Sequence, residues 1–230
     1  MKVKLISYSK PSSEVLSEFQ DPPDLQDLVS YCARVSNPSN QSNTETTNRL
    51  LRYLIKNKHW SPFEMVSACL EITTTRDIAR QILRHRSFSF QEFSQRYADP
   101  VKELDFVLRE ARLQDTTNRQ NSFSLDFRRE NHRDIARWWA DSQNEILKLV
   151  KENYTAAISM GIAKEVARSI LPEGLTTSRL YINGTLRSWI HYIELRSGNG
   201  TQQEHAEIAL ACAEVIAKVF PFITEFKGDV

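Results

Sequence analysis

The sequence predicts a mixed α/β fold with more helix than strand, in which helices flank a central mixed sheet. Residues 1–9 and 63–74 alternate apolar and polar side chains, which is typical of half-buried strands. Residues 131–160 and 185–196 carry apolar side chains at helical spacing. Length alone allows one large domain or two small ones, and we expect a single domain over residues 1–230. The order of the strands does not follow from these patterns.

The other predicted elements rest on local patterns. Residues 24–35 and 46–58 have the apolar spacing of core helices, and residues 162–171 that of a short helix before a proline. Residues 201–204 have the sequence of a capping box, Thr-Gln-Gln-Glu, which should start the last core helix. The long helix over residues 131–160 is expected from a stripe of apolar side chains that follow the helical period. That stripe comprises Ile135, Trp138, Ile146, Leu149, Val150, Ala157 and Ile158.

Residues 99–130 give the weakest signal in the chain. A strand over residues 106–113 and a turn over residues 116–121 fit the pattern best. Three arginines in this part could bind ligands, but a solvated basic face is the more common place for such charges. They are Arg109, Arg112 and Arg119.

Composition excludes several classes of protein. The formal net charge of +1 argues against a general nucleic-acid binder, because such proteins neutralise phosphates with excess positive charge. No apolar run has the length of a membrane span, and no segment has the form of a signal peptide. Cys32, Cys69 and Cys212 lie far apart in apolar segments, as reduced core thiols do, so we expect neither a disulfide framework nor a metal site. These features predict a cytoplasmic protein.

Glycine usage limits the possible nucleotide sites. The chain has six glycines and the first is Gly161, so a phosphate-binding loop rich in glycine is excluded from the first two-thirds of the sequence. Arginine supplies 19 of the 30 basic residues. A nucleotide would therefore be held by side chains, which excludes an ordinary Rossmann dehydrogenase.

Residues 84–97 combine chemistry that neither a plain loop nor a plain core strand uses. They hold three arginines, a histidine, a glutamate and three serines, interleaved with three phenylalanines. Charged donors beside aromatic walls suit an anionic ligand with a flat ring, and the planar fork of arginine matches phosphate oxygens. The alternative is a surface helix that runs into an amphipathic strand.

The local pattern places these groups. Residues 75–85 have helical spacing with Thr75 as the N-cap, so that Gln81, Arg84 and His85 should share one face. The spacing then becomes strand-like.

If the chain stays extended beyond residue 90, Glu92, Ser94 and Arg96 point the same way and offer an acceptor, a hydroxyl and a cation.

A second cluster lies at residues 59–64, His-Trp-Ser-Pro-Phe-Glu. Pro62 should stop the preceding helix and bias Ser61 toward an extended conformation. The residues alone leave two interpretations open, either a ligand site or a helix stop followed by a strand.

Together these motifs resemble the flavin-dependent thymidylate synthases. The signature is Arg84-His85-Arg86, seven residues and then Ser94, and its inner positions hold Ser89, Glu92 and Arg96. The resemblance continues through His59 to Glu64, through residues 164–172 and through the helix over residues 185–196. Three positions depart from many members of the family, namely Gln91, Thr185 and Gly200.

The resemblance implies the fold of that family and the reductive methylation of dUMP to dTMP. Methylenetetrahydrofolate would donate the carbon, FAD would be the redox cofactor and NADPH the reductant. It also implies a homotetramer whose active sites are shared between subunits, with no nucleic-acid or membrane partner. No cysteine has the basic neighbours of an activated thiolate, so an enzyme nucleophile of that kind is not expected.

The resemblance also implies roles for individual residues. Arg196 matches the catalytic arginine. The positions expected to bind the flavin are His59, Ser61, Arg84, His85, Arg86, Glu92, Arg187 and His191, with Glu64 in support. The positions expected to bind dUMP are Gln81, Arg84, Glu92, Ser94, Arg96, Arg168 and Arg196.

Two other functions fit the residues and stay open at this point. One is a different flavoprotein on the same scaffold, such as an oxidase of a related nucleotide. The other is an RNA-binding module that stacks bases on the phenylalanines of residues 84–97, against which the near-neutral charge speaks.

Overall fold

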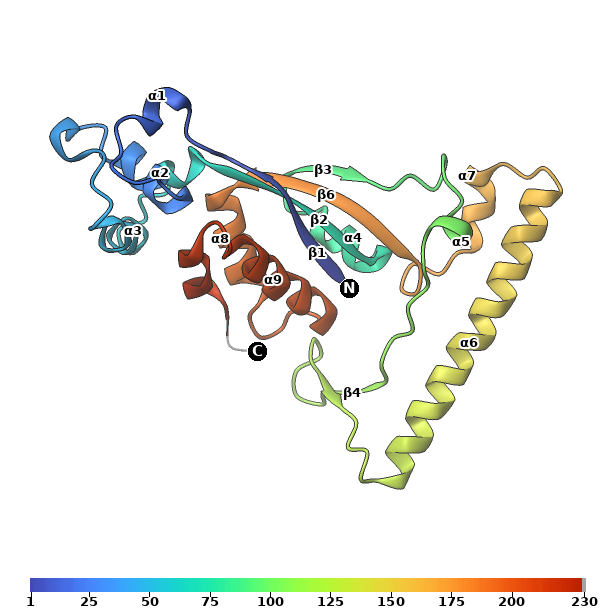
Figure 1. Ribbon diagram of the computed structural model, residues 1–230. Coiled ribbons are helices and arrows are strands. Elements are labelled where there is room, and N and C mark those ends of the chain that lie inside the picture. The colour runs from blue at the N-terminus through green and yellow to red at the C-terminus, as the bar shows by residue number, and fades with distance from the viewer. Residues whose placement is uncertain (229–230) are drawn as a thin grey trace.

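A four-stranded sheet with the order β1-β2-β6-β3 forms the centre of the protein, whose computed structural model describes residues 1–228 (Figure 1). Its strands are β1 (Lys2–Tyr8), β2 (Ser67–Thr75), β6 (Thr177–Thr185) and β3 (Ser89–Glu92). The predicted α/β class is confirmed. Each pair of neighbouring strands is antiparallel, however, whereas the sequence analysis expected a mixed sheet. A separate antiparallel hairpin joins β4 (Arg112–Gln114) to β5 (Ser122–Ser124).

The helices occupy three regions around this sheet. Those at the left end of Figure 1 are α1 (Ser13–Leu16), α2 (Leu25–Ala33) and α3 (Thr47–Lys56). Those beside the sheet are α4 (Arg76–Ile82), α8 (Leu186–Arg196) and α9 (Gln203–Ile216). Those at the right end of Figure 1 are α5 (Pro100–Glu103), α6 (Glu130–Ser159) and α7 (Lys164–Ala167). Short 3-10 turns cover Pro38–Asn40, Ser61–Glu64, Arg168–Ile170 and Pro221–Phe226.

The main hydrophobic core lies between one face of the sheet and the helices α4, α8 and α9. Ala68, Leu70 and Ile72 of β2 point to this face and are fully buried, which follows from the period of two along a strand. The opposite face carries polar residues such as Arg179 and Tyr181, and both of these are exposed. Figure 1 shows α4, α8 and α9 on the same side of the sheet.

Strands β2 and β6 each run directly into a helix, and a threonine marks both junctions. Thr185 accepts a hydrogen bond from the backbone N–H of Ser188 at 3.3 Å and caps α8. Thr75 occupies the same place before α4, but its hydroxyl donates to Asp77 and does not cap the helix as expected. Because β2 and β6 are antiparallel, α4 and α8 leave the sheet at opposite ends.

Helix α6 confirms the predicted position of the long helix, but much of its apolar stripe is not covered. Ile135, Trp138, Ile146 and Leu149 are exposed, Trp138 to 66%. The helix is held to the body by a face that carries the buried residues His132, Gln143, Leu147 and Tyr154. Val150, Ala157 and Ile158 of the stripe pack against the cluster that contains Tyr154. In Figure 1 α6 stands apart from the sheet along most of its length.

Three further local predictions are wrong. Helix α3 ends at Lys56, well before Pro62, because the chain turns at Lys58 with a positive φ of 57°. Ser61 then lies in a 3-10 turn and is not extended. Helix α9 starts from Gln202 without a side-chain cap, so residues 201–204 do not form a capping box.

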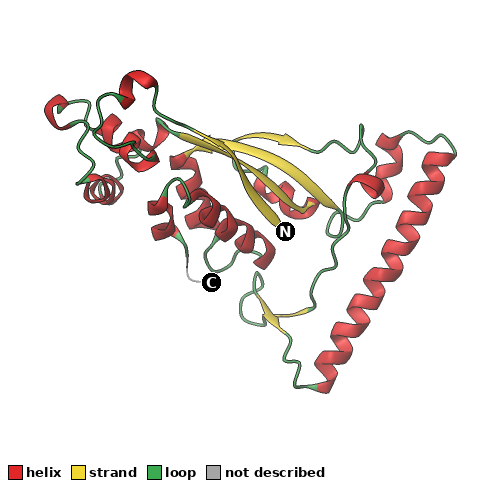
Figure 2. Ribbon diagram, in the orientation of Figure 1, coloured by secondary structure: helices red, strands yellow, loops and turns green. Residues whose placement is uncertain are grey.

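The expected strand over residues 106–113 is also absent as a continuous strand. Phe106 makes one isolated bridge to Thr176, and regular pairing begins only at Arg112. The turn predicted over residues 116–121 does join β4 to β5. Figure 2 shows that most of the chain between α5 and α6 is loop.

Candidate functional site

Arg196 and His85 are in contact at the C-terminal end of α8. The Nε of Arg196 donates a hydrogen bond to Nε2 of His85 at 3.0 Å. Burial and the adjacent Arg196 lower the pKa of His85, so the imidazole is neutral and its Nε2 is free to accept. The contact uses only one nitrogen of the guanidinium. Its two terminal nitrogens can therefore face a ligand.

Gln81 reaches the same region from α4. Its Oε1 lies 3.1 Å from Nδ1 of His205, a buried residue of α9 that the sequence analysis did not select. The other ring nitrogen of His205 lies 3.2 Å from the hydroxyl of Tyr192. The Tyr192 ring also packs edge-on against His85, with centroids 5.0 Å apart. The sequence analysis placed Gln81, Arg84 and His85 on one helical face, but α4 ends at Ile82 and leaves Arg84 exposed.

A buried ion-pair network continues from Gln81. Its Nε2 donates to Gln202 at 2.8 Å, and Gln202 donates in turn to Glu204 at 2.9 Å. Arg109 and Arg112 contact the two oxygens of Glu204 at 3.1 and 2.6 Å. Although burial opposes ionisation, the hydrogen bonds from Arg112 and Gln202 lower the pKa of Glu204, which stays a carboxylate.

This network corrects the expected solvated basic face. The side chain of Arg109 is only 15% exposed and also pairs with Asp77 at 2.7 Å. That of Arg112 is 14% exposed, and among the three arginines only Arg119 is exposed as expected. A buried charge needs a charged partner, and the partners Asp77 and Glu204 lie far away in the sequence.

A second group of predicted residues, the corner group, lies where the turn Ser61–Glu64 meets α8. It comprises His59, Trp60, Ser61, Glu64, Arg187 and His191. Arg187 pairs with Glu64 at 2.6 Å, and the rings of Trp60 and His191 lie 4.4 Å apart between centroids. Burial, followed by the charge of Arg187, lowers the pKa of His191. His59 and Ser61 are exposed beside them.

A third group, the far-end group, comprises Ser94, Arg96, Glu165 and Arg168. Arg96 lies 3.4 Å from Glu165, and both side chains are more than half exposed. The chain turns after Ser94, whose carbonyl accepts from the N–H of Tyr97 at 3.1 Å. The extended geometry expected for Glu92, Ser94 and Arg96 is therefore wrong.

Glu92 instead points back to the sheet, where its Oε1 accepts from Ser178 at 2.7 Å and lies 3.5 Å from Arg76. The remaining members of the motif, Arg84 and Arg86, are exposed in the turn before β3.

The predicted residues thus fall into separate places on one chain. Arg168 lies in the 3-10 turn that precedes β6 and Arg187 in the helix that follows it, and nine residues of strand span roughly 30 Å. Figure 1 shows α7 and α8 at opposite ends of β6. One chain brings Gln81, His85 and Arg196 together, but it does not bring these residues to the far-end group.

A cavity of about 530 Å³ adjoins the ion-pair network. Arg112 and Gln202 line it, together with Phe123 of β5 and the loop of residues 198–201. Gly200 in this loop has a φ of 87°, a conformation that disfavours any side chain, and an added Cβ would lie 3.5 Å from Gln120. A hairpin residue therefore stands where a larger side chain at position 200 would point.

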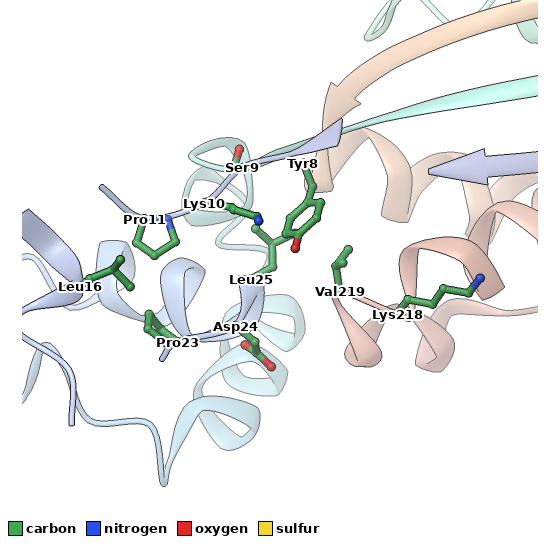
Figure 3. Close-up of a pocket in the computed structure, with 10 residues that line it drawn as sticks. All are labelled: Tyr8, Ser9, Lys10, Pro11, Leu16, Pro23, Asp24, Leu25, Lys218 and Val219. Atoms are coloured by element: carbon green, nitrogen blue, oxygen red, sulfur yellow. The ribbon is translucent and has the colours of Figure 1, made fainter. Parts of the chain in front are cut away.

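The cavity in Figure 3 is not part of this site. It lies between the segment after β1 and the residues that follow α9, and Tyr8, Lys10, Asp24 and Lys218 are among its lining residues. None of the predicted site residues lines it. Within residues 1–228, no cluster of three or more histidine, cysteine, aspartate or glutamate residues could hold a metal ion. No helix in the same range has both the length and the apolar character that a bilayer crossing requires.

The sequence analysis missed several residues of the network. They are Asp77, Tyr192, Gln202, Glu204 and His205. The spacing of Arg109 and Arg112 was visible, as was a glutamate beside a histidine at the start of the last helix. The ion pairs that Arg109 and Arg112 form with Glu204 were not visible, because they depend on tertiary contacts.

Comparison with known proteins points to one family. A family model described as thymidylate synthase complementing protein matches residues 15–222. A probable flavin-dependent thymidylate synthase of Paramecium bursaria Chlorella virus 1 is 48% identical over 98% of both chains. A flavin-dependent thymidylate synthase of Synechocystis sp. is 48% identical over 97% of both chains.

Solved structures give the same answer for the fold. The UMP/dUMP methylase PolB from Streptomyces cacaoi, in its crystal structure with 5-Br dUMP, matches with a TM-score of 0.76 at 26% identity. The match covers 98% of this chain and 93% of that one. The chain therefore belongs to the flavin-dependent thymidylate synthase family. The predicted enzyme class, a flavin-dependent methyltransferase, is thereby confirmed.

The buried His205 makes stability depend on pH. Burial, and then the charge of Arg196 and the proximity of His85, lower the pKa of His205 from 6.5 to about 3. The unfolded chain therefore binds a proton between these pH values that the folded chain does not, and the free energy of unfolding falls as the pH drops from 6.5 toward 3. One such proton contributes a slope of about 1.4 kcal/mol per pH unit.

We expect His205→Asn to have a shallower decline, because asparagine does not titrate. Urea unfolding at a series of pH values measures both curves. Identical slopes for the two proteins would contradict the buried neutral state of His205.

Proposed function

We propose that the protein converts dUMP to dTMP with methylenetetrahydrofolate as carbon donor, FAD as redox cofactor and NADPH as reductant. The observation that carries the proposal is the pair of Arg196 and neutral His85 beside Gln81, in a chain that belongs to this family. Bound FAD would supply the reducing electrons for the methylation. The residues of the chain bind, orient and polarise the substrate.

Arg196 acts on the pyrimidine ring in this proposal. Its Nε is engaged by His85, so the orientation of the guanidinium is fixed before a ligand arrives. A fixed cation beside the pyrimidine favours loss of the N3 proton and stabilises the resulting anion. Neutral His85 supports this role, because a protonated imidazole could not accept the bond from Arg196.

The far-end group suits the phosphate of dUMP. Arg96 and Arg168 supply cations and Ser94 a hydroxyl; Ser94 and Arg96 are exposed and Arg168 is half-buried. The ion pair of Arg96 with Glu165 is exposed, and such pairs contribute about 0–1 kcal/mol. A phosphate dianion can therefore replace Glu165 at Arg96 at little cost.

The corner group fits a flavin nucleotide by the chemistry of its donors. Arg187 offers a cation whose pairing with Glu64 is partly exposed, and His59 and Ser61 offer further polar groups. Trp60 and His191 offer flat rings close together. These residues would hold FAD. Thr185, which departs from many family members, is used as the cap of α8.

No cysteine is suited to attack the uracil. Burial raises the pKa of Cys32, Cys69 and Cys212, which opposes formation of the thiolate. Free thiols also fit the expected cytoplasmic location. We propose that the reaction proceeds without a cysteine nucleophile.

We further propose a homotetramer whose active sites combine residues from different subunits. The separation of Arg168 from Arg187 along β6 supports this, because one chain divides the binding groups between its two ends. The exposed apolar stripe of α6 supplies surface for association, since large exposed apolar patches mark interaction sites.

Ser94→Ala should test the phosphate role together with the reaction. Wild-type protein supplied with FAD, dUMP, methylenetetrahydrofolate and NADPH should form dTMP. The variant should raise the KM for dUMP by about tenfold, the effect of one lost hydrogen bond to a charged group, and should keep measurable turnover.

Ser39→Ala, at an exposed serine in the loop before α3, is the matched control and should behave as wild type. Loss of all chemistry in Ser94→Ala with dUMP binding intact would contradict phosphate binding and favour a nucleophilic serine. Absence of dTMP from the wild-type reaction would contradict the proposed function itself.

Arg168→Ala and Arg187→Ala test whether the sites are shared. Each variant alone should be nearly inactive. If one site takes Arg168 and Arg187 from different subunits, co-expressed mixtures should regain up to about a quarter of wild-type activity, because random assembly then pairs two intact arginines at some sites.

Light scattering on the same samples measures the oligomeric state. A mixture no more active than the two variants assayed separately would show that each subunit builds its own site.

A further inference from the structure

The ion-pair network has a direction that runs from Glu204 to Tyr192. A carboxylate can only accept hydrogen bonds, so Gln202 must turn its Nε2 toward Glu204. Its Oε1 then faces Gln81 and can only accept, so Gln81 must present its own Nε2 at 2.8 Å. The Oε1 of Gln81 is thereby turned toward His205.

The same logic fixes the tautomer of His205. Because Oε1 of Gln81 accepts, Nδ1 of His205 must carry the hydrogen. The imidazole is neutral, which leaves Nε2 bare, and the hydroxyl of Tyr192 must donate to it. Burial raises the pKa of Tyr192 well above its ordinary value, so the phenol keeps its proton for this bond.

Glu204, from which this series of hydrogen bonds starts, is held firmly in place. Arg109 and Arg112 each contact one oxygen of Glu204, and both arginines are largely buried. Arg109 is fixed further by Asp77, and its backbone exchanges two hydrogen bonds with the side chain of Gln143 on α6. Neither the Gln81 amide nor the Gln202 amide can flip without leaving two acceptors or two donors face to face.

Gln81 keeps part of its hydrogen-bonding capacity for a ligand. One hydrogen of Nε2 and one lone pair of Oε1 are used within the network, which leaves one of each. A uracil ring has adjacent donors and acceptors along its edge. An amide in a fixed orientation can match that edge, whereas a flipped amide places like groups opposite each other.

We propose that Glu204, Gln202 and His205 are positioning residues that hold the Gln81 amide in the one orientation that the pyrimidine of dUMP requires. The inference rests on the proposed function, since it takes dUMP as the ligand. It adds to the motif residues a set at the start of α9 that does not need to touch the substrate.

Two variants of His205 distinguish a role in orienting Gln81 from a general contribution to the stability of the fold. An asparagine amide nitrogen can occupy the place of Nδ1, and a glutamine amide that of Nε2. His205→Asn should keep the bond to Gln81 and bind dUMP within about threefold of wild type, whereas His205→Gln keeps only the contact with Tyr192 and should raise the Kd about tenfold. Equilibrium dialysis with labelled dUMP measures the Kd, and kcat should change little in both.

A second pair of variants covers the case in which changes at the buried His205 prevent folding. Gln202→Met keeps the side-chain length but removes both hydrogen bonds, and should raise the Kd for dUMP about tenfold. Gln203→Met is the control, because Gln203 lines the same cavity and its side chain bonds Glu207 and no member of the network.

Equal Kd values within each pair would overturn the positioning role. A wild-type protein that fails to bind dUMP would instead overturn the proposed function, and with it this inference. Comparison with wild type therefore separates the two failures.

Discussion

The buried carboxylate of Glu204 is the constraint on which the functional region depends. Its two arginines come from the loop before β4 and from β4 itself, and Arg109 also binds α4 through Asp77 and α6 through Gln143. One charge cluster therefore ties together four parts of the chain. Removing one partner of such a cluster typically costs about 3–5 kcal/mol, because the others are left buried and unpaired.

This constraint explains how a segment with little regular structure is held in place. Most of the chain between α5 and α6 is loop, and little of it joins the main core. Ion pairs and the β4–β5 hairpin fix it against α9 instead. The hairpin also lines the cavity beside Gly200, whose positive φ disfavours any residue with a side chain.

The sheet determines where the predicted site residues lie. Strands β2 and β6 are antiparallel and each is followed by a helix, so functional side chains gather at both ends of the sheet. Gln81 returns from one end and Arg196 from the other, and they meet beneath the sheet near His205. The corner and far-end groups remain at the outer ends, which is the arrangement that subunits sharing a site would use.

The sequence predicted the regular elements well because their periodicity is local. The strands β1 and β2 and the helices α2, α3, α6, α8 and α9 all lie close to their expected ranges. The apolar stripe of α6 was predicted at the right residues, but periodicity does not say which apolar face a single chain covers. Ile135 and Trp138 follow the helical period and are nevertheless exposed in this chain.

The site was predicted in part. The residues of the motif at 84–97 were identified, but their geometry was wrong where a turn replaced the expected strand after Ser94. The hydrogen bonds from Arg196 to His85 and from Gln81 to Gln202 join residues more than 100 positions apart. Such contacts leave no trace in local spacing, and the same is true of the ion pairs of Arg109.

The central claim is that Arg196 acts on the substrate and is not needed to hold the flavin. The most direct measurement is the visible spectrum and turnover of Arg196→Ala beside Arg196→Lys. The account predicts that both variants keep a flavin band that dithionite bleaches, while turnover falls roughly 100-fold or more, because lysine lacks the planar fork. Turnover near the wild-type value in Arg196→Ala would contradict the account.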